Sequence, residues 1–414
     1  MIDRRLRDLL PLFAAVFIDI FSFGLMYPVI IALFHDPVVV GVYSPALRDS
    51  YLSLAFSLFP LGMFFGASFL GDLSDAIGRR RTLLICMAGL ALAYMLMWLA
   101  VETRELLFFL AGRLISGLMA GTSPIAQAAM MDRSSEAERG ANMAHVVLVN
   151  CIGLVTGPAV GGVLGHLDFR APLGFALVLC VMAFFWIRRS HIEEAAPGKG
   201  PRKPARLAAS WRRPIEVFLR ALRHPAIGPL ALSFLLFQLG FGLYYIYIMV
   251  KMQKLHHVTS LELGLFSAVM GLGFVLGTTL AYQRASAWLR SDAKVAALGL
   301  LLCGGLILLA AGPLGAPAQW ALAFAVAASN LLAFIGLLTL ISAAAGPEEQ
   351  GWALGIGAAM TALAFFLAGL AAAALTVVPL WLLIAAGGVI VLAGLWPLRA
   401  ARPPGAAVVP AGAE

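Results

Sequence analysis

Charged residues are scarce in this sequence. Only 12% of its 414 residues are Asp, Glu, Lys or Arg, whereas 61% are hydrophobic and the mean hydropathy is +0.93. A soluble domain of this composition would expose large apolar patches. Apolar runs of about 20 residues recur, each long enough to cross a ~30 Å hydrocarbon core as a helix, and the alternation of a transmembrane β-barrel is missing. The composition therefore indicates an all-α, multi-pass membrane protein.

Cysteines and paired acids are equally few. The four cysteines all fall inside apolar runs and lack the spacing of metal ligands, which argues against a disulfide framework or a metal site. Intramembrane hydrolysis would need paired acids, an H-E-x-x-H motif or a Ser/His arrangement, and we find none of these patterns. The sequence therefore does not predict an enzyme, and we expect no cofactor.

Twelve apolar segments predict twelve membrane spans. Counted with the N-terminus inside, 23 of the 29 Lys and Arg residues lie on cytoplasmic segments and 5 on the opposite side. By the positive-inside rule we expect both termini in the cytoplasm and attribute the net charge of +8 to orientation rather than to nucleic acid. The expected spans are 10–33, 51–71, 82–101, 106–131, 142–165, 172–187, 226–250, 262–283, 294–312, 318–341, 351–375 and 380–396.

One long polar stretch, 188–224, divides the spans into two sets of six. We expect a six-helix bundle at 1–187, a cytoplasmic linker at 188–224, a second six-helix bundle at 225–397 and a disordered cytoplasmic tail at 398–414. Within the linker, 211–222 has the pattern of an amphipathic helix that could lie on the inner leaflet. Two six-helix halves around a midplane site are a recurrent transporter design.

A compact charged turn, GDLSDAIGRRRTLL, follows the second span. It resembles the signature loop of the major facilitator superfamily, G-x-L-(small)-D-(basic)-x-G-(basic)-(basic), although Ala76 stands where a basic residue is usual. Gly78 permits a tight turn, and the arginines could anchor the loop at anionic lipid. The matching positions that we expect to form a conformational latch are Gly71, Asp75, Gly78, Arg79 and Arg80.

The resemblance implies a fold of two pseudo-symmetric six-helix bundles. It also implies that the loop docks against the start of the eleventh span in the outward-facing state. Here that start is GPEEQGWALG, where Gln350 and Gly351 leave room for close approach.

Asp19 and Arg113 are the acid and the base that we expect in mid-membrane. Arg113, Gly117 and Gly121 lie four residues apart on the fourth span and resemble the superfamily's R-x-x-x-G-x-x-x-G motif. An ionisable residue inside a membrane is a functional-site hypothesis by default. Helix rise places the two residues within roughly 6 Å in height, so we expect them to pair. The alternative role for this pair is static, joining the first and fourth spans.

Asp19 also lies nine positions before Pro28, and this spacing resembles the first span of tetracycline:proton antiporters and vesicular monoamine transporters. The resemblance implies that Asp19 takes part in proton coupling or contacts the amine of a substrate. Ser22 and Phe23 would share its cavity. The remaining pocket candidates are helix-borne polar or aromatic residues, namely Gln127, Asn150, Gln238, Tyr244, Tyr245, Asn330 and Phe334.

A ladder of glycines marks the fifth span. Small residues at a period of four let another helix approach closely, and we expect Gly273 and Gly277 on the eighth span to provide the matching face. The stretch looks like the antiporter motif of the superfamily, G-x-x-x-G-P-x-x-G-G, which is typical of exporters. The matching residues are Gly153, Gly157, Pro158, Gly161 and Gly162.

Together these features predict a secondary transporter that works by alternating access. We expect a proton-coupled exporter (antiporter) of small amphipathic or cationic molecules, driven by the proton gradient, in a bacterial inner membrane. We expect it to act as a monomer, with a small-molecule substrate and the lipid bilayer as partners. One alternative is an exporter of an endogenous metabolite such as a siderophore or metallophore, whose anionic groups would contact Arg113. An importer or a ligand-binding receptor without flux is also open.

Overall fold

The computed structural model describes residues 4–41, 43–190, 212–345, 349–375 and 377–401. These residues form helices and no strand. Twelve of the described helical segments are long and apolar enough to cross a membrane, and each coincides with a span expected from the sequence. The expected tail at 398–414 falls mostly outside the described residues, although a helix continues to Ala400.

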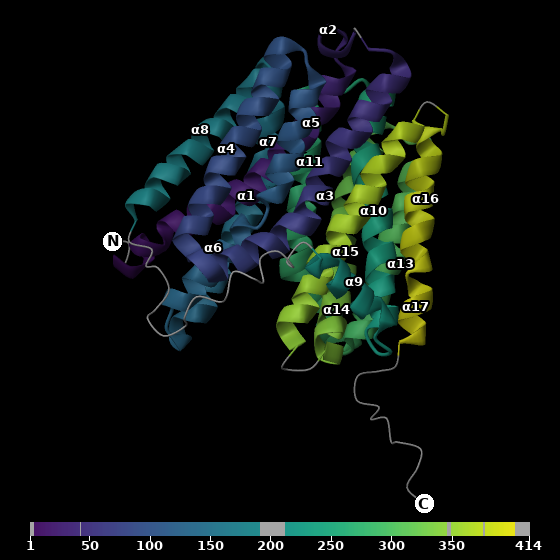
Figure 1. Ribbon diagram of the computed structural model, residues 1–414. Helices are drawn as coiled ribbons and strands as arrows, with labels where there is room; N and C mark the ends of the chain where they lie inside the picture. The colour runs from purple at the N-terminus through teal and green to yellow at the C-terminus, as the bar shows by residue number, and fades with distance from the viewer. Residues whose placement is uncertain (1–3, 42, 191–211, 346–348, 376, 402–414) are drawn as a thin grey trace, which may run out of the picture.

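The first bundle contains the first six spans (Figure 1). The fourth span is divided between two helices, and a short helix, α2 (Pro37–Val40), follows the first span. The bundle comprises α1 (Arg4–His35), α3 (Pro45–Ile77), α4 (Arg79–Thr103), α5 (Leu106–Leu118), α6 (Thr122–Arg133), α7 (Glu136–Leu167) and α8 (Arg170–Arg189).

The second bundle contains the last six spans. It is preceded by α9 (Arg213–Arg223), which forms where the linker pattern predicts an amphipathic helix. The bundle comprises α10 (Gly228–His256), α11 (Ser260–Leu276), the π-helical η2 (Gly277–Ala281), α12 (Tyr282–Leu289), α13 (Asp292–Ala311), α14 (Ala316–Ala345), α15 (Gln350–Leu370), the 3₁₀-helical η4 (Ala371–Ala374), α16 (Leu380–Ala393) and α17 (Leu395–Ala400).

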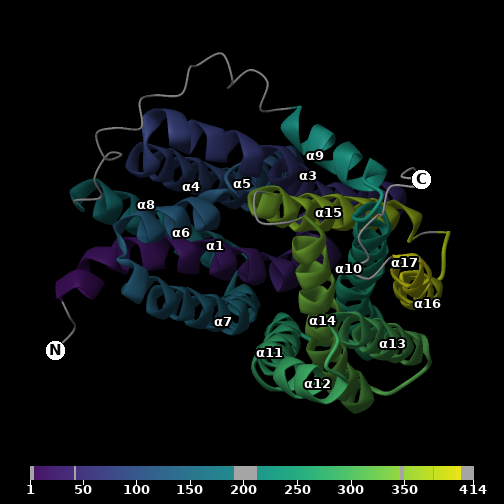
Figure 2. The same ribbon diagram turned by 90° about the horizontal axis from the view of Figure 1, so that it is seen from below.

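The two bundles lie side by side, and their opposite ends are named here by the helices found there. The α2 end carries α2, and the α9 end carries α9 and the turn between α3 and α4 (Figures 1 and 2). Across the interface α7 packs on α11, and α3 packs on α15. These are spans 5 with 8 and 2 with 11. In two pseudo-symmetric halves, span 5 corresponds to span 11 and span 8 to span 2, so the two contacts are equivalent.

The fourth span is broken at Met119–Gly121, between α5 and α6. The Thr122 hydroxyl donates to the carbonyl of Met119 at 3.0 Å, which satisfies one group that the break releases. In the first turn of α6 the Thr122 amide donates to the carbonyl of Met119 at 3.3 Å and the Ile125 amide to that of Gly121 at 3.2 Å, and Pro124 has no N–H. The Ser123 amide is left without a backbone acceptor, as is usual at the start of an α-helix. In a membrane such groups must find another partner within the protein.

Lys251 is a buried base that the sequence analysis did not place in the membrane. It lies in α10, within the span Gly228–His256, and only 3% of its surface is exposed. Its ammonium group donates to the carbonyls of Ala310 at 2.8 Å and Gly312 at 2.7 Å. These carbonyls lie at the C-terminal end of α13, where a cation is electrostatically favoured. Lys251 is therefore a cap from one helix to the end of another.

The variant Lys251→Met should destabilise the protein because it leaves these carbonyls without a charged donor. Hydrogen bonds to charged groups contribute about 1.5–3 kcal/mol, so we expect a loss of that size in unfolding free energy. Thermal unfolding of purified protein would measure it. Lys294→Met, which removes an exposed lysine from α13, is the control. Equal unfolding midpoints in the two variants would contradict the capping role.

Candidate functional site

Asp19 binds the N-terminus of α6. Its position is ten residues into the first span, about 15 Å from the end at Leu9. The carboxylate accepts the backbone N–H of Ser123 at 3.3 Å, and Ser123 is the second residue of α6. The Gln127 side chain donates to the Ser123 hydroxyl at 3.0 Å, one turn further along. The break in the fourth span thus supplies the partner of Asp19, since a helix N-terminus favours an anion.

Arg113 does not pair with Asp19, which corrects the expectation from the sequence. Its Nε donates to the carbonyl of Ala55 at 2.9 Å, and its guanidinium lies 4.8 Å from the ring centroid of Phe59. Both partners belong to α3. Arg113 is 2% exposed, and it forms no ion pair with any described carboxylate. Helix rise gives the depth of a residue along the helix axis but not the direction in which its side chain points, so it could not show whether the two side chains face each other.

Aromatic side chains from both bundles meet between α1 and α10. The rings of Tyr27 and Tyr245 are edge to face, with centroids 4.8 Å apart. On the first-bundle side, Phe23 contacts Tyr27 at 5.1 Å and Phe59 at 5.6 Å. On the second-bundle side, Tyr245 lies 6.2 Å from Phe365 of α15. Edge-to-face aromatic pairs add about 0.5–1.5 kcal/mol each beyond their buried area, so this cluster contributes to holding the halves together.

Glycines bring α7 into backbone contact with its neighbours. A Cβ on Gly157 or Gly161 would lie 2.4 Å from a carbonyl oxygen of α1, so these two positions serve the packing of α1 on α7. A Cβ on Gly162 would lie 2.6 Å from the Cα of Gly264 in α11, across the two bundles. The contact lies near the end of α7 at Leu167, and it therefore seals the interface at the α2 end.

The prediction that Gly273 and Gly277 of the eighth span pack against the fifth span is wrong. Gly273 and Gly277 contact α14, where added Cβ atoms would meet the carbonyls of Phe324 and Ala328. The glycines of α11 that face α7 are Gly264 and Gly271. Small residues lie on two faces of α11, so their spacing alone does not show which face packs against α7. Of the other motif residues, Gly153 and Pro158 both pack against α1.

A cavity of about 780 Å³ opens between the bundles toward the α9 end. Its inner wall is apolar and includes Met63, Phe64 and Ile125. Its mouth is charged and includes Asp72 and Arg220. Ile125 lies two residues after Ser123, the partner of Asp19, although neither Asp19 nor Arg113 lines this cavity. A seal at one end and a cavity at the other are the geometry of one state of alternating access.

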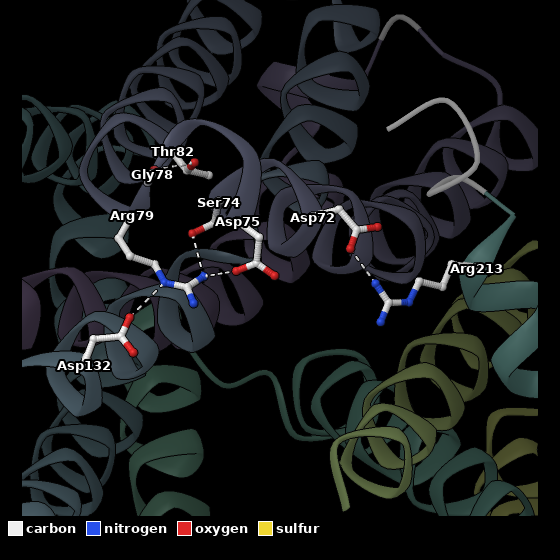
Figure 3. Close-up of polar contacts among 8 residues, drawn as sticks. All are labelled: Asp72, Ser74, Asp75, Gly78, Arg79, Thr82, Asp132 and Arg213. Atoms are coloured by element: carbon white, nitrogen blue, oxygen red, sulfur yellow. Dashed lines mark hydrogen bonds and ion pairs between the residues drawn. The ribbon is translucent and has the colours of Figure 1, made fainter. Parts of the chain in front are cut away.

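The turn between α3 and α4 is held by Arg79 (Figure 3). Gly78 has a φ of 99°, a region that L side chains rarely adopt, which confirms the expected tight turn. Arg79 binds Asp75 at 2.8 Å, the Ser74 hydroxyl at 3.0 Å and Asp132 of α6 at 3.4 Å. All these partners belong to the first bundle.

Arg80 and Gly71 complete the account of this turn. Arg80 donates to the carbonyls of Ile187 and Arg188 at the end of α8, so Arg79 and Arg80 both bind groups of the protein, and anchoring of the loop at anionic lipid stays a prediction. Gly71 has open space around its Cα. Gln350 begins α15, but the side chain of Gln350 and the surroundings of Gly351 lie outside what the structure describes.

The other pocket candidates are dispersed. Gln238 donates to the Thr361 hydroxyl at 2.9 Å and so joins α10 to α15. Tyr244 is fully buried, and its hydroxyl has no hydrogen-bond partner among the described residues. Phe334 packs on Phe234 of α10 with centroids 5.4 Å apart. Ser22, Asn150 and Asn330 each have a side-chain oxygen or nitrogen that is buried without a hydrogen bond.

Sequence reasoning missed three groups that the structure brings to the bundle interface. Tyr27 and Phe365 belong to the aromatic cluster, and Asp72 binds Arg213 of α9 (Figure 3). Asp72 stands inside the signature loop, and Arg213 lies within the amphipathic helix predicted at 211–222 and begins α9. Their opposite charges at the same expected membrane face were a usable signal for this contact.

Comparison with known proteins identifies the family. The sequence model of the Major Facilitator Superfamily matches residues 9–369. The chain belongs to the Major Facilitator Superfamily. It is therefore a multi-pass membrane transporter of the secondary type and not an enzyme.

Bacterial members of the superfamily are among its relatives. The class G tetracycline resistance protein of Vibrio anguillarum is 29% identical over 358 residues, which cover 80% of this chain and 86% of that protein. The class C protein of Escherichia coli is 29% identical over 235 residues, 56% of this chain and about half (55%) of that protein.

Solved structures agree on the fold. The human organic anion transporter MFSD10 (TETRAN) superposes with a TM-score of 0.66 at 21% identity, covering 96% of this chain and 100% of that one. A peptide transporter POT in complex with sulfate superposes with a TM-score of 0.74 at 16% identity, covering 95% of this chain and 93% of that one. At these identities the likeness concerns the fold alone.

Gly162→Ala should open the seal at the α2 end of this transporter. The added methyl overlaps Gly264, and overpacking of this kind costs about 1–3 kcal/mol, enough to shift a two-state equilibrium about 5- to 150-fold. Spin labels on Leu167→Cys and Leu265→Cys, in a background with Cys151 replaced by Ser, would report the distance between α7 and α11. We expect a larger population of long distances.

Gly305→Ala, whose Cβ meets no atom within 4 Å, is the matched control and should leave the distances unchanged. Unchanged distances in Gly162→Ala would refute the seal.

Proposed function

We propose that this transporter is a proton-coupled exporter of small amphipathic molecules, including cations, and that Asp19 is the proton site. The observation that carries the proposal is the environment of Asp19. Asp19 is half-buried within a membrane span, and its carboxylate accepts one long hydrogen bond from Ser123. No described Lys or Arg pairs with it. A buried charge without a counter-ion is costly, and either a proton or a bound cation removes that cost.

This arrangement supports exchange because the proton and the cation compete. A carboxyl group that has taken a proton no longer attracts a cationic cargo, and a bound cargo displaces the proton. Movement between the two states of the bundles would then carry one species in each direction. The weak hold of the α6 N-terminus on Asp19 leaves the carboxylate free to change partner.

The cavity supports amphipathic cargo. Its volume of about 780 Å³ falls within the range of sites for drug-sized ligands, and its apolar depth with a charged mouth suits a molecule with both characters. The Lys and Arg asymmetry would place the α9 end in the cytoplasm, so that the described state is open inward and the location is a bacterial inner membrane. Export is supported by the glycine ladder of α7, which resembles the antiporter motif. Tetracycline is a reasonable first probe because curated relatives bear the name of tetracycline resistance proteins.

Asp19→Asn should abolish proton release while leaving the protein folded, because the amide has nearly the same shape but cannot ionise. Everted vesicles energised to an acid interior would be given tetracycline, then cationic, neutral and anionic compounds, while interior pH is recorded. We expect alkalinisation on addition of cargo with the wild type and none with Asp19→Asn. Glu105→Gln makes the same change at an exposed acid of the first bundle and should behave as the wild type. Cargo-dependent proton release that survives Asp19→Asn would exclude Asp19 as the coupling residue.

A second candidate function is export of an anionic endogenous metabolite, such as a siderophore. The observation that favours it is Arg113, a buried cation that Asp19 does not neutralise. Tyr27 and Tyr94 lie within its electrostatic reach, and Phe59 covers its guanidinium. An anionic aromatic cargo would find a cation and ring faces together, while Asp19 would carry only the proton.

Arg113→Gln distinguishes the two candidates. If Arg113 binds cargo, 2,3-dihydroxybenzoate transport should fall about 10- to 100-fold, which corresponds to the loss of one charge-assisted contact, while tetracycline transport persists. Flux of the two radiolabelled compounds into vesicles would measure this. Arg284→Gln removes an exposed arginine of α12 as the control. Equal loss of both fluxes, with a lower unfolding midpoint, would assign Arg113 to holding α3 alone.

A further inference from the structure

The helix α9 joins the two bundles at the end where the cavity opens. On its inner face Pro214 and Ala221 are buried. Arg213 binds Asp72 near the end of α3, in the first bundle. Arg220 binds Glu349 at the start of α15, in the second bundle, and its guanidinium lies 4.3 Å from the ring centroid of Trp352. One helix thus contacts both halves through its two arginines.

The outer face of α9 is apolar and only partly covered by the described residues, because Phe218 and Leu222 pack against the hydrophobic core on one side while Ile215 and Leu219 remain exposed. Ile215 and Leu219 are 45% and 42% exposed, and Phe218 and Leu222 are partly exposed. The spacing i, i+3, i+4 and i+7 places these four side chains on one stripe of a helix. They form the outer stripe, and in a soluble setting such a stripe would be an unfavourable exposed patch.

Two unpaired arginines lie at the ends of the outer stripe. Arg212 precedes α9 and Arg223 ends it, and both are exposed. Neither forms an ion pair with a described carboxylate. Arg213 and Arg220 are already bound to acids on the inner face. Glu216, the acid of α9, is also exposed and lines the cavity mouth, so Arg212 and Arg223 against one acid leave a net positive charge that complements an anion.

The position of α9 determines what covers the outer stripe. The helix ends at Arg223, and α10, which begins the seventh span, starts five residues later at Gly228. Figure 2 shows α9 at the rim of the molecule, beside α3 and α15, and its inner residues line the mouth of the cavity. A helix at the start of a span and at the rim lies at the level of the lipid headgroups. Amphipathic helices with flanking arginines bind there through acyl chains and anionic headgroups together.

We propose that the outer stripe of α9, with Arg212 and Arg223, is a binding surface for anionic phospholipid, and that the bound lipid stabilises α9 in its contact with both bundles. The two faces of α9 act at the same time because they lie on opposite sides of the helix. Lipid on the outer face and the ion pairs on the inner face therefore favour the same position of α9. The state open at the α9 end should accordingly be favoured in anionic membranes.

Hydrogen–deuterium exchange of the full-length protein tests the proposal. Nanodiscs of phosphatidylcholine alone would be compared with nanodiscs that also contain phosphatidylglycerol. We expect amide exchange in α9 to be at least about fivefold slower with phosphatidylglycerol, since one arginine near an anionic surface contributes about that factor. The double variant Arg212→Gln/Arg223→Gln should lose this difference. Exchange equal in the two membranes for the wild type would overturn the proposal.

The matched control is Arg284→Gln/Lys294→Gln, which removes two exposed cations from α12 and α13 and should keep the difference. If this control lost the difference as well, general surface potential would replace α9 as the cause.

A second variant, Ile215→Ser/Leu219→Ser, keeps all the arginines and should lose protection in both membranes. If it kept full protection, the apolar part of the proposal would fail. A protein partner for the outer stripe would give equal exchange in both nanodiscs, with protection appearing only in native membranes. The experiment uses neither cargo nor a pH gradient, so its outcome is independent of the proposed proton coupling.

Discussion

The membrane core forces every backbone N–H and C=O group to find a partner inside the protein, and this constraint governs where the buried charges lie. Asp19 binds the free N–H of Ser123, Arg113 binds the carbonyl of Ala55, and Lys251 binds the end of α13. Each of the three charges satisfies a backbone group and none pairs with another charge. In a solvent that offers no hydrogen bonds, a side chain that satisfies an interrupted helix stabilises both groups. Asp19 and Lys251 are therefore held at a helix break and a helix end, whereas Arg113 binds a carbonyl inside α3.

Separation of Asp19 from Arg113 has a functional consequence. A tight ion pair would neutralise both groups and would have to be broken before either could bind a proton or a cargo. Removing a partner from a buried ion pair costs about 3–5 kcal/mol. Here each group has a weaker and dipolar partner, so either group can accept a ligand without first losing a full charge. The first bundle thus offers an anion and a cation as two independent sites.

Sequence determined the spans because length and hydropathy act locally, and the signature loop because its residue types follow from turn geometry. The side of a helix on which a residue lies was harder. The Asp19–Arg113 pair was wrong because helix rise gives height but not rotation, and the partner of Asp19 is created by a break that Gly117 and Gly121 did not reveal. Gly264 and Gly273 are both glycines of α11 and look alike in the sequence. Only the packing shows that Gly264 faces α7 and Gly273 faces α14. Lys251 lay one residue outside an expected span boundary, and such boundaries are the least certain part of a prediction.

The two ends of the interface hold the bundles by different forces, and this difference bears on how the transporter changes state. At the α2 end the contact is between backbones and aromatic rings, through Gly162 with Gly264 and Tyr27 with Tyr245. Such packing is short-ranged and is lost over a small displacement. At the α9 end the contacts are ion pairs of partly exposed groups, such as Asp72 with Arg213, which contribute little individually and can exchange partners. Opening the α2 end therefore carries most of the energetic cost, and closing the α9 end requires mainly that arginines and acids change partners. A cargo or proton that alters the charge near Asp19 therefore needs to supply only the difference in free energy between the state open at the α9 end and the state open at the α2 end.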